Sequence, residues 1–208
     1  MIVVQDMNIS SIIFLTIITF VSNATPFFGA PYTIIASIIL LKQGFTPINY
    51  IIISVITGIS AAAAKIIMYG VGYGLKNPLK RNKNIQLLSK FISAKTKYFI
   101  IALFILAILP GLPFDDYLFI GGGAVRASLQ KMEGVAVIAK ILKSFIEIYI
   151  ESKGISFIHY ITSLSDLEIG IISFIVFLVI GFILLKIDWE KYISLAMKYL
   201  KKYENPKL

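Results

Sequence analysis

Hydrophobic residues fill this chain in runs of unequal length, and the length of each run predicts whether it can cross a bilayer. The run 48–75 is predicted to form a spanning helix, because about 20 apolar residues cross a hydrocarbon core roughly 30 Å thick. The runs 134–150 and 169–185 are predicted to be a second and a third span, although charged residues interrupt the second one. Helices are therefore expected to dominate the fold.

Two further apolar regions are interrupted in their middle, so neither half can cross alone. The arms 9–21 and 32–41 flank the first interruption, and the arms 98–109 and 117–125 flank the second. The last two arms hold 12 and 9 residues, which extend about 18 and 14 Å and reach only the middle of the hydrocarbon core. Each region is therefore predicted to form a re-entrant hairpin. The hairpin tips carry Pro26, Pro31, Pro110, Gly111 and Pro113.

The two interruptions share a local pattern. Residues 29–33 read Gly-Ala-Pro-Tyr-Thr, and residues 111–115 read Gly-Leu-Pro-Phe-Asp. One crossing separates the two units, so they would enter from opposite faces as an inverted repeat, which in known transporters places the binding site where broken helices meet. The predicted fold class is an all-α integral membrane protein built from an inverted repeat: two re-entrant helical hairpins, about three spanning helices and a C-terminal amphipathic helix.

Composition supports a membrane location. Hydrophobic residues make up 58% of the chain and charged residues 15%, whereas soluble domains carry roughly 25% charged residues. The net charge is +9, but the basic residues lie in loops and in the tail, which argues against nucleic acid and favours anionic lipid headgroups as partners. The chain has no cysteine, so disulfides, thiolate metal sites and cysteine nucleophiles are excluded.

The basic segment 76–97 predicts the orientation. It holds seven Lys or Arg residues and no acidic residue, and such loops lie in the cytoplasm. Residues 188–208 are predicted to be a basic amphipathic tail on the same side, after a single membrane domain at 1–187. We therefore expect a multi-pass protein of the cell membrane, and a homo-oligomer is left open.

Four features of the chain form a further pattern. They are Pro31 with the arm that follows it, the small-residue segment from Ser60 to Gly74 with Tyr69-x-x-Gly72, the motif Leu109-Pro110-Gly111-x-Pro113, and the glycine run 121–123. Together they resemble the motifs of the DedA family, whose shared core is also called the VTT or SNARE-associated Golgi protein domain. The resemblance covers about residues 25–150. It implies two re-entrant hairpins and a role in moving lipids across the bilayer, either polyprenyl-phosphate carriers or phospholipids.

The chain also departs from that family. Bacterial members typically carry acids where this chain has Lys65 and Thr33, and arginines where it has Ala107 and Pro113. The charge pattern is partly inverted, so the proton-coupled anion mechanism that the resemblance implies is not carried over intact.

Asp115 and Asp116 are the first candidate site residues, because the second hairpin brings them to the middle of the bilayer. A charged Asp there costs about 2.5–3.5 kcal/mol, so two of them need partners, protonation or a wet cavity. One of them can cap the half-helix that follows, which stabilises a helix by about 1 kcal/mol and leaves the other unexplained. Lys65 either extends toward the interface or pairs with Asp115 or Asp116, and both interpretations stay open.

Charged residues also follow one face of the segment 134–150. Lys140, Lys143, Glu147 and Glu151 are spaced by 3, 4 and 4 residues, and Lys143 with Glu147 can form an i, i+4 pair. This face either lines a wet groove for headgroups or packs with its charges paired. Arg126 is interpreted as an interfacial anchor or as a contact for a lipid phosphate.

The sequence favours a lipid flippase or scramblase whose headgroup passes Asp115, Asp116 and Lys65, with protons or cations as coupling partners. A small-ion or solute transporter with the same broken-helix centre is the alternative. An enzyme is not expected, because nucleophile and metal-ligand motifs are lacking. His159, the only histidine, is expected in an outer loop, and neither a metal nor another cofactor is expected.

Overall fold

The computed structural model describes residues 8–25, 31–79, 83–109, 114–165, 167–173, 175–176 and 179. These residues form helices and connecting turns, with no strand among them. The helices are α1 (Ile9–Ala24), α2 (Tyr32–Lys42), α3 (Pro47–Ala63), α4 (Lys65–Gly74), α5 (Lys76–Leu79), α6 (Lys83–Ile108), α7 (Phe114–Ala124) and α8 (Leu129–Ile161). The predicted tip residues Pro26, Pro110, Gly111 and Pro113 and the predicted tail 188–208 lie outside the described residues, and the third predicted span lies partly outside them.

The first predicted span is confirmed as a helix of sufficient length and hydropathy. Residues Pro47–Gly74 form 28 helical residues with a mean hydropathy of 2.1, and they alone within the described part of the chain are long and apolar enough to cross a membrane. Thr46 caps the N-terminus of this segment, because its hydroxyl oxygen accepts a hydrogen bond from the Asn49 amide (3.2 Å). Pro47 occupies the first turn, where proline is favoured. A one-residue break at Ala64 divides it into α3 and α4.

The arms of the first interrupted region are short helices, as predicted. α1 holds 16 residues and α2 holds 11. Pro31 precedes the first residue of α2, where its missing amide hydrogen costs nothing. At 1.5 Å per residue α2 extends about 16 Å, which is half of a hydrocarbon core.

Two segments that were predicted as loops are helical. The basic segment 76–97 contains α5 and most of α6, which continues without a break into the apolar arm. The predicted connection 151–168 is largely the last part of α8, a single helix of 33 residues. Charge alone does not end a helix, since Lys, Gln and Glu are good helix formers and only Gly or Pro opposes helix strongly. His159 therefore lies in the last turn of α8 rather than in a loop.

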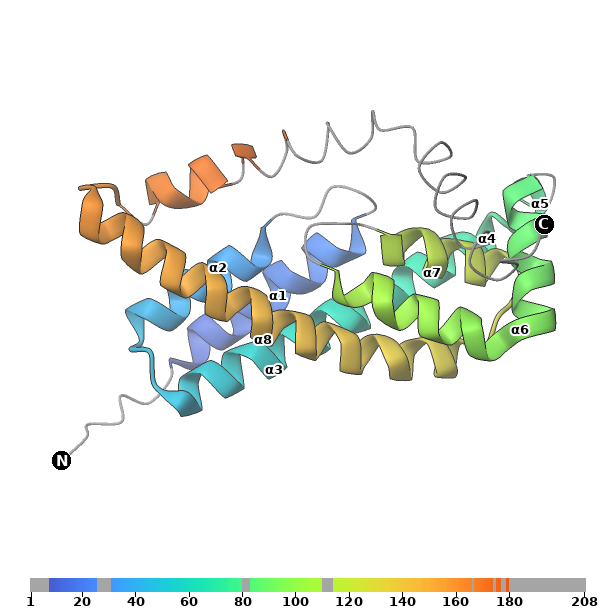
Figure 1. Ribbon diagram of the computed structural model, residues 1–208, viewed down its shortest axis with the longest axis horizontal. Helices are drawn as coiled ribbons and strands as arrows, with labels where there is room; N and C mark the ends of the chain where they lie inside the picture. The colour runs from blue at the N-terminus through green and yellow to red at the C-terminus, as the bar shows by residue number, and fades with distance from the viewer. Residues whose placement is uncertain are drawn as a thin grey trace, which may run out of the picture.

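The helices form two halves, α1 to α4 and α6 to α8, whose packing follows the same pattern. α1 packs on α3 in the first half, and α6 packs on α8 in the second. The short helix of each half packs on the long segment of the other half: α2 lies on α8, and α7 lies on α4. α3 and α8 lie side by side at the centre (Figure 1). The two halves are thus interlocked through their short helices.

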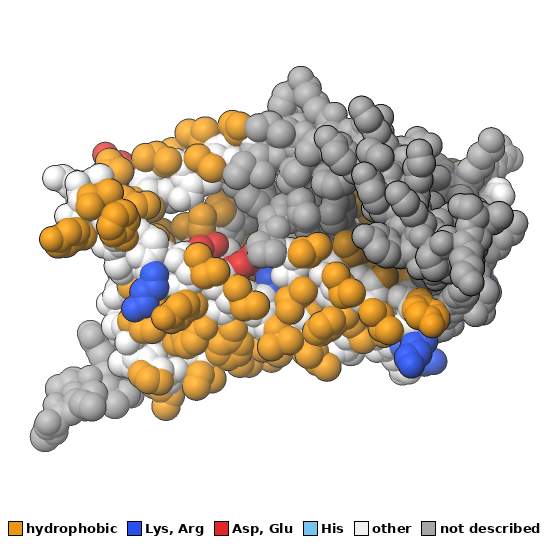
Figure 2. Space-filling view, viewed as in Figure 1, with side chains coloured by type: hydrophobic (Ala, Val, Ile, Leu, Met, Phe, Trp, Pro, Cys, Tyr) orange, Lys and Arg blue, Asp and Glu red, His pale blue; other side chains and the backbone are white. Residues whose placement is uncertain are grey.

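The exterior is apolar and the interior is partly polar. On α1 the side chains of Ile9, Ile13, Ile17 and Val21 are 72%, 54%, 58% and 53% exposed, whereas Thr19 is fully buried. Figure 2 shows hydrophobic side chains over most of the described part of one face, with a few acidic and basic atoms in a recess near the middle. Apolar side chains thus cover much of the described surface and also fill two buried clusters.

Two glycines bring α4 and α7 into backbone contact. A Cβ atom on Gly72 would lie 1.9 Å from the Ile120 carbonyl oxygen, and one on Gly123 would lie 2.1 Å from the Tyr69 carbonyl oxygen. Only glycine allows such an approach. The contact sets the position of α7 relative to α4.

Replacing Gly72 with alanine tests this contact. Gly72→Ala is expected to lower the free energy of unfolding by about 1–3 kcal/mol, because the methyl group must push α7 away from α4. Gly70→Ala, on the same helix with no atom within 4 Å of its added methyl group, is expected to keep or raise stability. Thermal unfolding of both variants in detergent measures the difference, and equal behaviour would contradict the close contact.

Candidate functional site

The two aspartates of the second interrupted region occupy the first turn of α7. Asp115 is 2% exposed and Asp116 is 5% exposed. Because α7 lies on α4, this turn faces Lys65, which begins α4 directly after the break at Ala64 and is itself 2% exposed. Three buried charges therefore come from two helices that are distant in sequence.

Lys65 pairs with both aspartates. Its Nζ donates a hydrogen bond to Asp116 Oδ1 and lies 3.4 Å from Asp115 Oδ2. Lys140 on α8 supplies the fourth charge, with its Nζ 2.7 Å from Asp115 Oδ2. The group Lys65, Lys140, Asp115 and Asp116, here called the central charge cluster, carries no net charge.

The neutrality of this cluster explains how four charges can remain buried. Each ion loses several kcal/mol of hydration on burial, and only close partners of opposite sign offset that loss. The close approach of α4 and α7 supplies the geometry. A ligand that carries an anionic group can replace a carboxylate beside either ammonium without adding charge.

The polar face of α8 continues away from the central charge cluster. Lys143 Nζ lies 3.8 Å from Glu147 Oε1, so the predicted i, i+4 pair is present. One turn further, Glu151 accepts hydrogen bonds from Thr33 Oγ1 (2.8 Å) and Ser37 Oγ (3.0 Å) on α2. The charges on this face are thus packed against other helices and bound by partners.

Buried hydroxyl groups also lie on α1, α3 and α8, and α3 packs against both of the other helices. Five of them form no hydrogen bond with the described residues: Thr19, Ser54, Thr57, Ser144 and Ser152. Buried polar groups in native proteins almost always have partners. The interior therefore offers several donors and acceptors to water or to a polar ligand.

Arg126 lies apart from the central charge cluster, at the other end of α7. Its φ of 59° places it in the left-handed region, and the amides of Arg126 and Ala127 donate to Gly123 O (3.1 Å) and Gly122 O (2.8 Å). These two bonds form the Schellman motif that ends helices. The exposed guanidinium lies 5.5 Å from the centre of the Tyr73 ring.

A second cation lies over the same aromatic ring. Lys76 Nζ is 4.9 Å from the centre of the Tyr73 ring. Lys76 and Arg126 are distant in sequence, but both contact this ring near the end of α4. Cations over aromatic rings are attracted by about 0.5–1 kcal/mol at exposed sites. Both interpretations of Arg126, as an anchor or as a phosphate contact, fit this position.

The sequence left open whether Lys65 extends toward the interface or pairs with Asp115 or Asp116, and the structure shows it beside both. Lys140 was placed on the polar face of α8 but was not paired with Asp115, although it is the nearest cation to that carboxylate. Thr33 and Ser37 were not assigned to Glu151. Their spacing of four residues, which places both hydroxyls on one side of α2, was the available signal.

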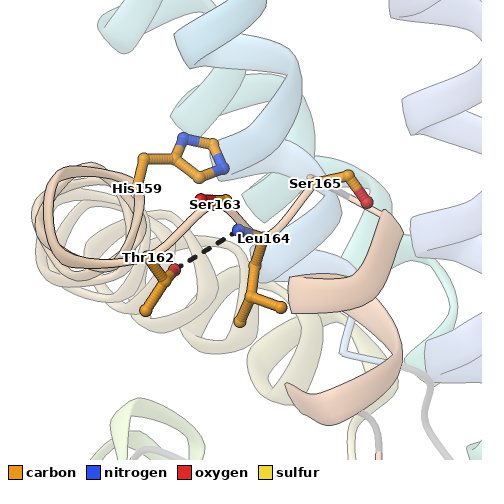
Figure 3. A pocket seen from close by; sticks show the side chains of 5 residues that line it. All are labelled: His159, Thr162, Ser163, Leu164 and Ser165. Carbon is orange, nitrogen blue, oxygen red and sulfur yellow. Dashed lines mark hydrogen bonds between the residues drawn. The ribbon is translucent and has the colours of Figure 1, made fainter.

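A surface pocket lies at the far end of α8 (Figure 3). Its lining residues are His159, Thr162, Ser163, Leu164 and Ser165. The Leu164 amide donates to Thr162 Oγ1 (3.4 Å), which orders the turn after the helix. The pocket holds no carboxylate and lies about 28 Å along α8 from the central charge cluster.

Comparisons of the chain with protein-family models, with curated proteins and with solved structures find no match.

The pairing of Asp115 with Lys140 can be tested by a double-mutant cycle. Lys140→Met leaves a buried negative charge in excess and is expected to lower the free energy of unfolding by about 3–5 kcal/mol. Asp115→Asn leaves an excess ammonium and is expected to cost a similar amount. The double variant retains the balanced pair of Lys65 and Asp116, so it is expected to lose clearly less than the sum of the two single losses.

Chemical unfolding in detergent micelles measures all four proteins of the cycle. A coupling energy of about 1 kcal/mol or more between the two substitutions is expected. Additive losses would show that the two side chains do not form a functional pair.

Proposed function

We propose that the protein moves lipids with anionic headgroups across the bilayer, as a flippase or scramblase. The observation that carries this proposal is the central charge cluster, which is buried in a helical bundle whose outer face is apolar. Balanced buried charges are costly to maintain, and charged residues inside membrane proteins commonly mark the path of a substrate. A headgroup that passes between the leaflets needs such a polar path.

Several features support a multi-pass membrane location. The exposed isoleucines of α1 form an apolar stripe that suits lipid tails better than water. The segment Pro47–Gly74 is long enough to span the core. α8 reaches about 50 Å and so exceeds a hydrocarbon core in length, but within the described residues only Pro47–Gly74 is also apolar enough to cross one.

The proposed topology is an inverted repeat with two re-entrant hairpins. The exchange of short helices between the halves, α2 onto α8 and α7 onto α4, supports it. With 11 residues each, α2 and α7 cannot cross a core of roughly 30 Å. The first turn of α7, with both aspartates, would then lie near the midplane, where broken helices bind substrates in known transporters.

The chemistry of the cluster suits a phosphate group. A phosphate accepts hydrogen bonds from ammonium groups as a carboxylate does. When a headgroup enters, Lys65 and Lys140 can exchange an aspartate for the phosphate, so neither ammonium is left without a partner. A zwitterionic phospholipid would also place its cationic end beside the displaced aspartate, whereas a polyprenyl phosphate would bring the anion alone.

The resemblance to the DedA family supports the same substrate class, since that family moves phospholipids or polyprenyl phosphates. The partly inverted charges of this chain are accommodated in the geometry, because Lys65 meets the acids of α7. The basic residues around Tyr73, together with the segment 76–97, fit a cytoplasmic face rich in anionic lipid.

A transporter of small ions or solutes is the second candidate. The buried hydroxyl groups without partners on α1, α3 and α8 favour it, since they can replace the hydration of a small polar solute. Flux of such a solute without lipid movement would separate the two candidates.

A liposome assay tests lipid transport. Vesicles that contain the purified protein and a fluorescent phospholipid or polyprenyl phosphate are treated with a membrane-impermeant quencher, and the slow phase of quenching reports movement between leaflets. The protein is expected to accelerate that phase. Rates equal to those of empty vesicles for both lipids would contradict the proposal.

A variant that keeps the charge balance separates function from folding. Lys65→Met, Lys140→Met, Asp115→Asn and Asp116→Asn together remove the cluster without leaving an excess charge, and they are expected to abolish lipid movement in a folded protein. The control is Glu168→Gln, at an exposed helical position after α8, which is expected to keep the full rate.

A further inference from the structure

Arg126 holds a backbone conformation that favours glycine. It is the only non-glycine residue with a positive φ (59°) among those that the structure describes. It occupies the position after α7 where a helix that ends in a Schellman motif usually carries glycine. A side chain at this position costs stability, because its Cβ atom crowds the neighbouring backbone carbonyl. The shape of the turn therefore does not account for an arginine, and its side chain must contribute through what it contacts.

The turn that carries Arg126 is held in place by its neighbours. The amides of Arg126 and Ala127 donate to carbonyl groups of α7, and Tyr69 Oη on α4 donates to Ala127 O (2.8 Å). α4, α5 and α7 meet at this end of the bundle (Figure 1). Lys76 begins α5, directly after the end of α4. The helix contacts therefore bring Arg126 and Lys76 to one place.

These two cations share one aromatic ring and lack a carboxylate partner. Arg126 Cζ and Lys76 Nζ lie 5.5 and 4.9 Å from the centre of the Tyr73 ring. Like charges so placed repel each other, and an exposed ring attracts each of them only weakly. Within the described part of the chain, neither cation has a carboxylate within 4 Å. The stretch 65–114 contains no acidic residue, so the counter-ion must come from outside it.

The ends of the two helices balance only part of the positive charge. α4 ends at Gly74 and α7 ends at Ala124, close to the two cations. The C-terminal end of a helix acts as about half a negative charge, so two ends supply about one. Arg126 and Lys76 supply two positive charges. About one positive charge remains, which matches the single negative charge of a phosphodiester.

An exposed apolar face of α4 lies beside the two cations. Ile66, Gly70 and Tyr73 follow one face of the helix, with spacings of 4 and 3 residues. The side chains of Ile66 and Tyr73 are exposed, and no atom lies within 4 Å of a Cβ atom added at Gly70. The face therefore has an open gap between two large apolar side chains. α4 extends about 15 Å, half of a hydrocarbon core, which suits an acyl chain of one leaflet.

We propose that Arg126 and Lys76 bind the phosphodiester of one anionic phospholipid of the cytoplasmic leaflet, whose acyl chain lies at the Gly70 gap on α4. The guanidinium supplies paired N–H donors that fit two phosphate oxygens, and the ammonium supplies a compact charge. Tyr73 holds both cations at the headgroup level, where tyrosine is favoured in membrane proteins. This lipid is a bound component rather than cargo. The site needs the proposed membrane location but not the proposed transport.

The surroundings favour an anionic headgroup over a zwitterionic one. A zwitterionic lipid brings an ammonium group, and the stretch 65–114 offers it no carboxylate. Asp115 and Asp116 lie at the opposite end of α7 and are paired within the central charge cluster. Free phosphate offers the same oxygen atoms as the lipid, but it would leave the apolar face of α4 without a partner.

Lipid binding to the purified full-length protein in an uncharged detergent tests the site. Titration with phosphatidylglycerol, followed by native mass spectrometry, is expected to show a tightly retained lipid on the wild type. Phosphatidylcholine and inorganic phosphate at the same concentration are expected not to displace it. Arg126→Gly is expected to weaken phosphatidylglycerol binding at least about tenfold, and Lys76→Gln is expected to weaken it about fivefold.

Two features of the variants separate a lost contact from a lost fold. Because glycine suits the backbone at position 126, Arg126→Gly is expected to keep or raise the unfolding temperature in detergent without lipid. Lys153→Gln is the matched control. Lys153 Nζ also lies over aromatic rings, 5.3 Å from the centre of Phe45 and 5.7 Å from that of Tyr149, where the described residues place no second cation. This variant is expected to bind phosphatidylglycerol as tightly as the wild type.

Three results would overturn the proposal. They are equal phosphatidylglycerol binding by the wild type and Arg126→Gly, equal binding of phosphatidylcholine and phosphatidylglycerol by the wild type, and displacement of the lipid by inorganic phosphate, which would indicate a site for phosphate alone. If the protein moves no lipid in the liposome assay but binds phosphatidylglycerol through Arg126, the proposed transport fails and the bound-lipid site stands.

Discussion

The attraction between two lysines and two aspartates in the interior is the interaction on which the rest of the structure depends. Each charge of the central charge cluster would be prohibitively costly alone, so α4, α7 and α8 must meet where Lys65, the aspartates and Lys140 can pair. Gly72 and Gly123 allow that meeting by removing side chains from the contact of α4 and α7. The break at Ala64 places Lys65 at the start of a new helix beside the first turn of α7.

The two halves carry different chemical groups where the short helix of one half meets the long segment of the other. At the α4 and α7 junction, ion pairs hold the helices together. At the α2 and α8 junction, Glu151 accepts hydrogen bonds from the hydroxyl groups of Thr33 and Ser37. The two sites lie about three turns apart along α8.

The sequence predicted those parts of the fold that depend on the length of apolar runs and on the spacing of residues along a helix. The long apolar segment, the short helices α1 and α2, and the pair of Lys143 with Glu147 follow from run length and helical spacing. The continuity of α6 and α8 was missed, because charge was taken as the sign of a loop although it does not oppose helix. The role of Lys140 was missed because the face of α8 that meets α7 depends on how helices pack. Spacing along α8 alone cannot show it.

The contact between lysine and aspartate side chains can be measured directly in a bilayer by solid-state nuclear magnetic resonance. Protein labelled with ¹⁵N at lysine Nζ and ¹³C at aspartate Cγ is placed in liposomes, and dipolar dephasing reports the distance between the two nuclei. Strong dephasing is expected, as for atoms in an ion pair, and it should be lost when Asp115 and Asp116 are both replaced by asparagine while Lys65 and Lys140 become methionine. Dephasing that is absent in the wild type, or unchanged in that variant, would show that the central charge cluster does not form in the membrane.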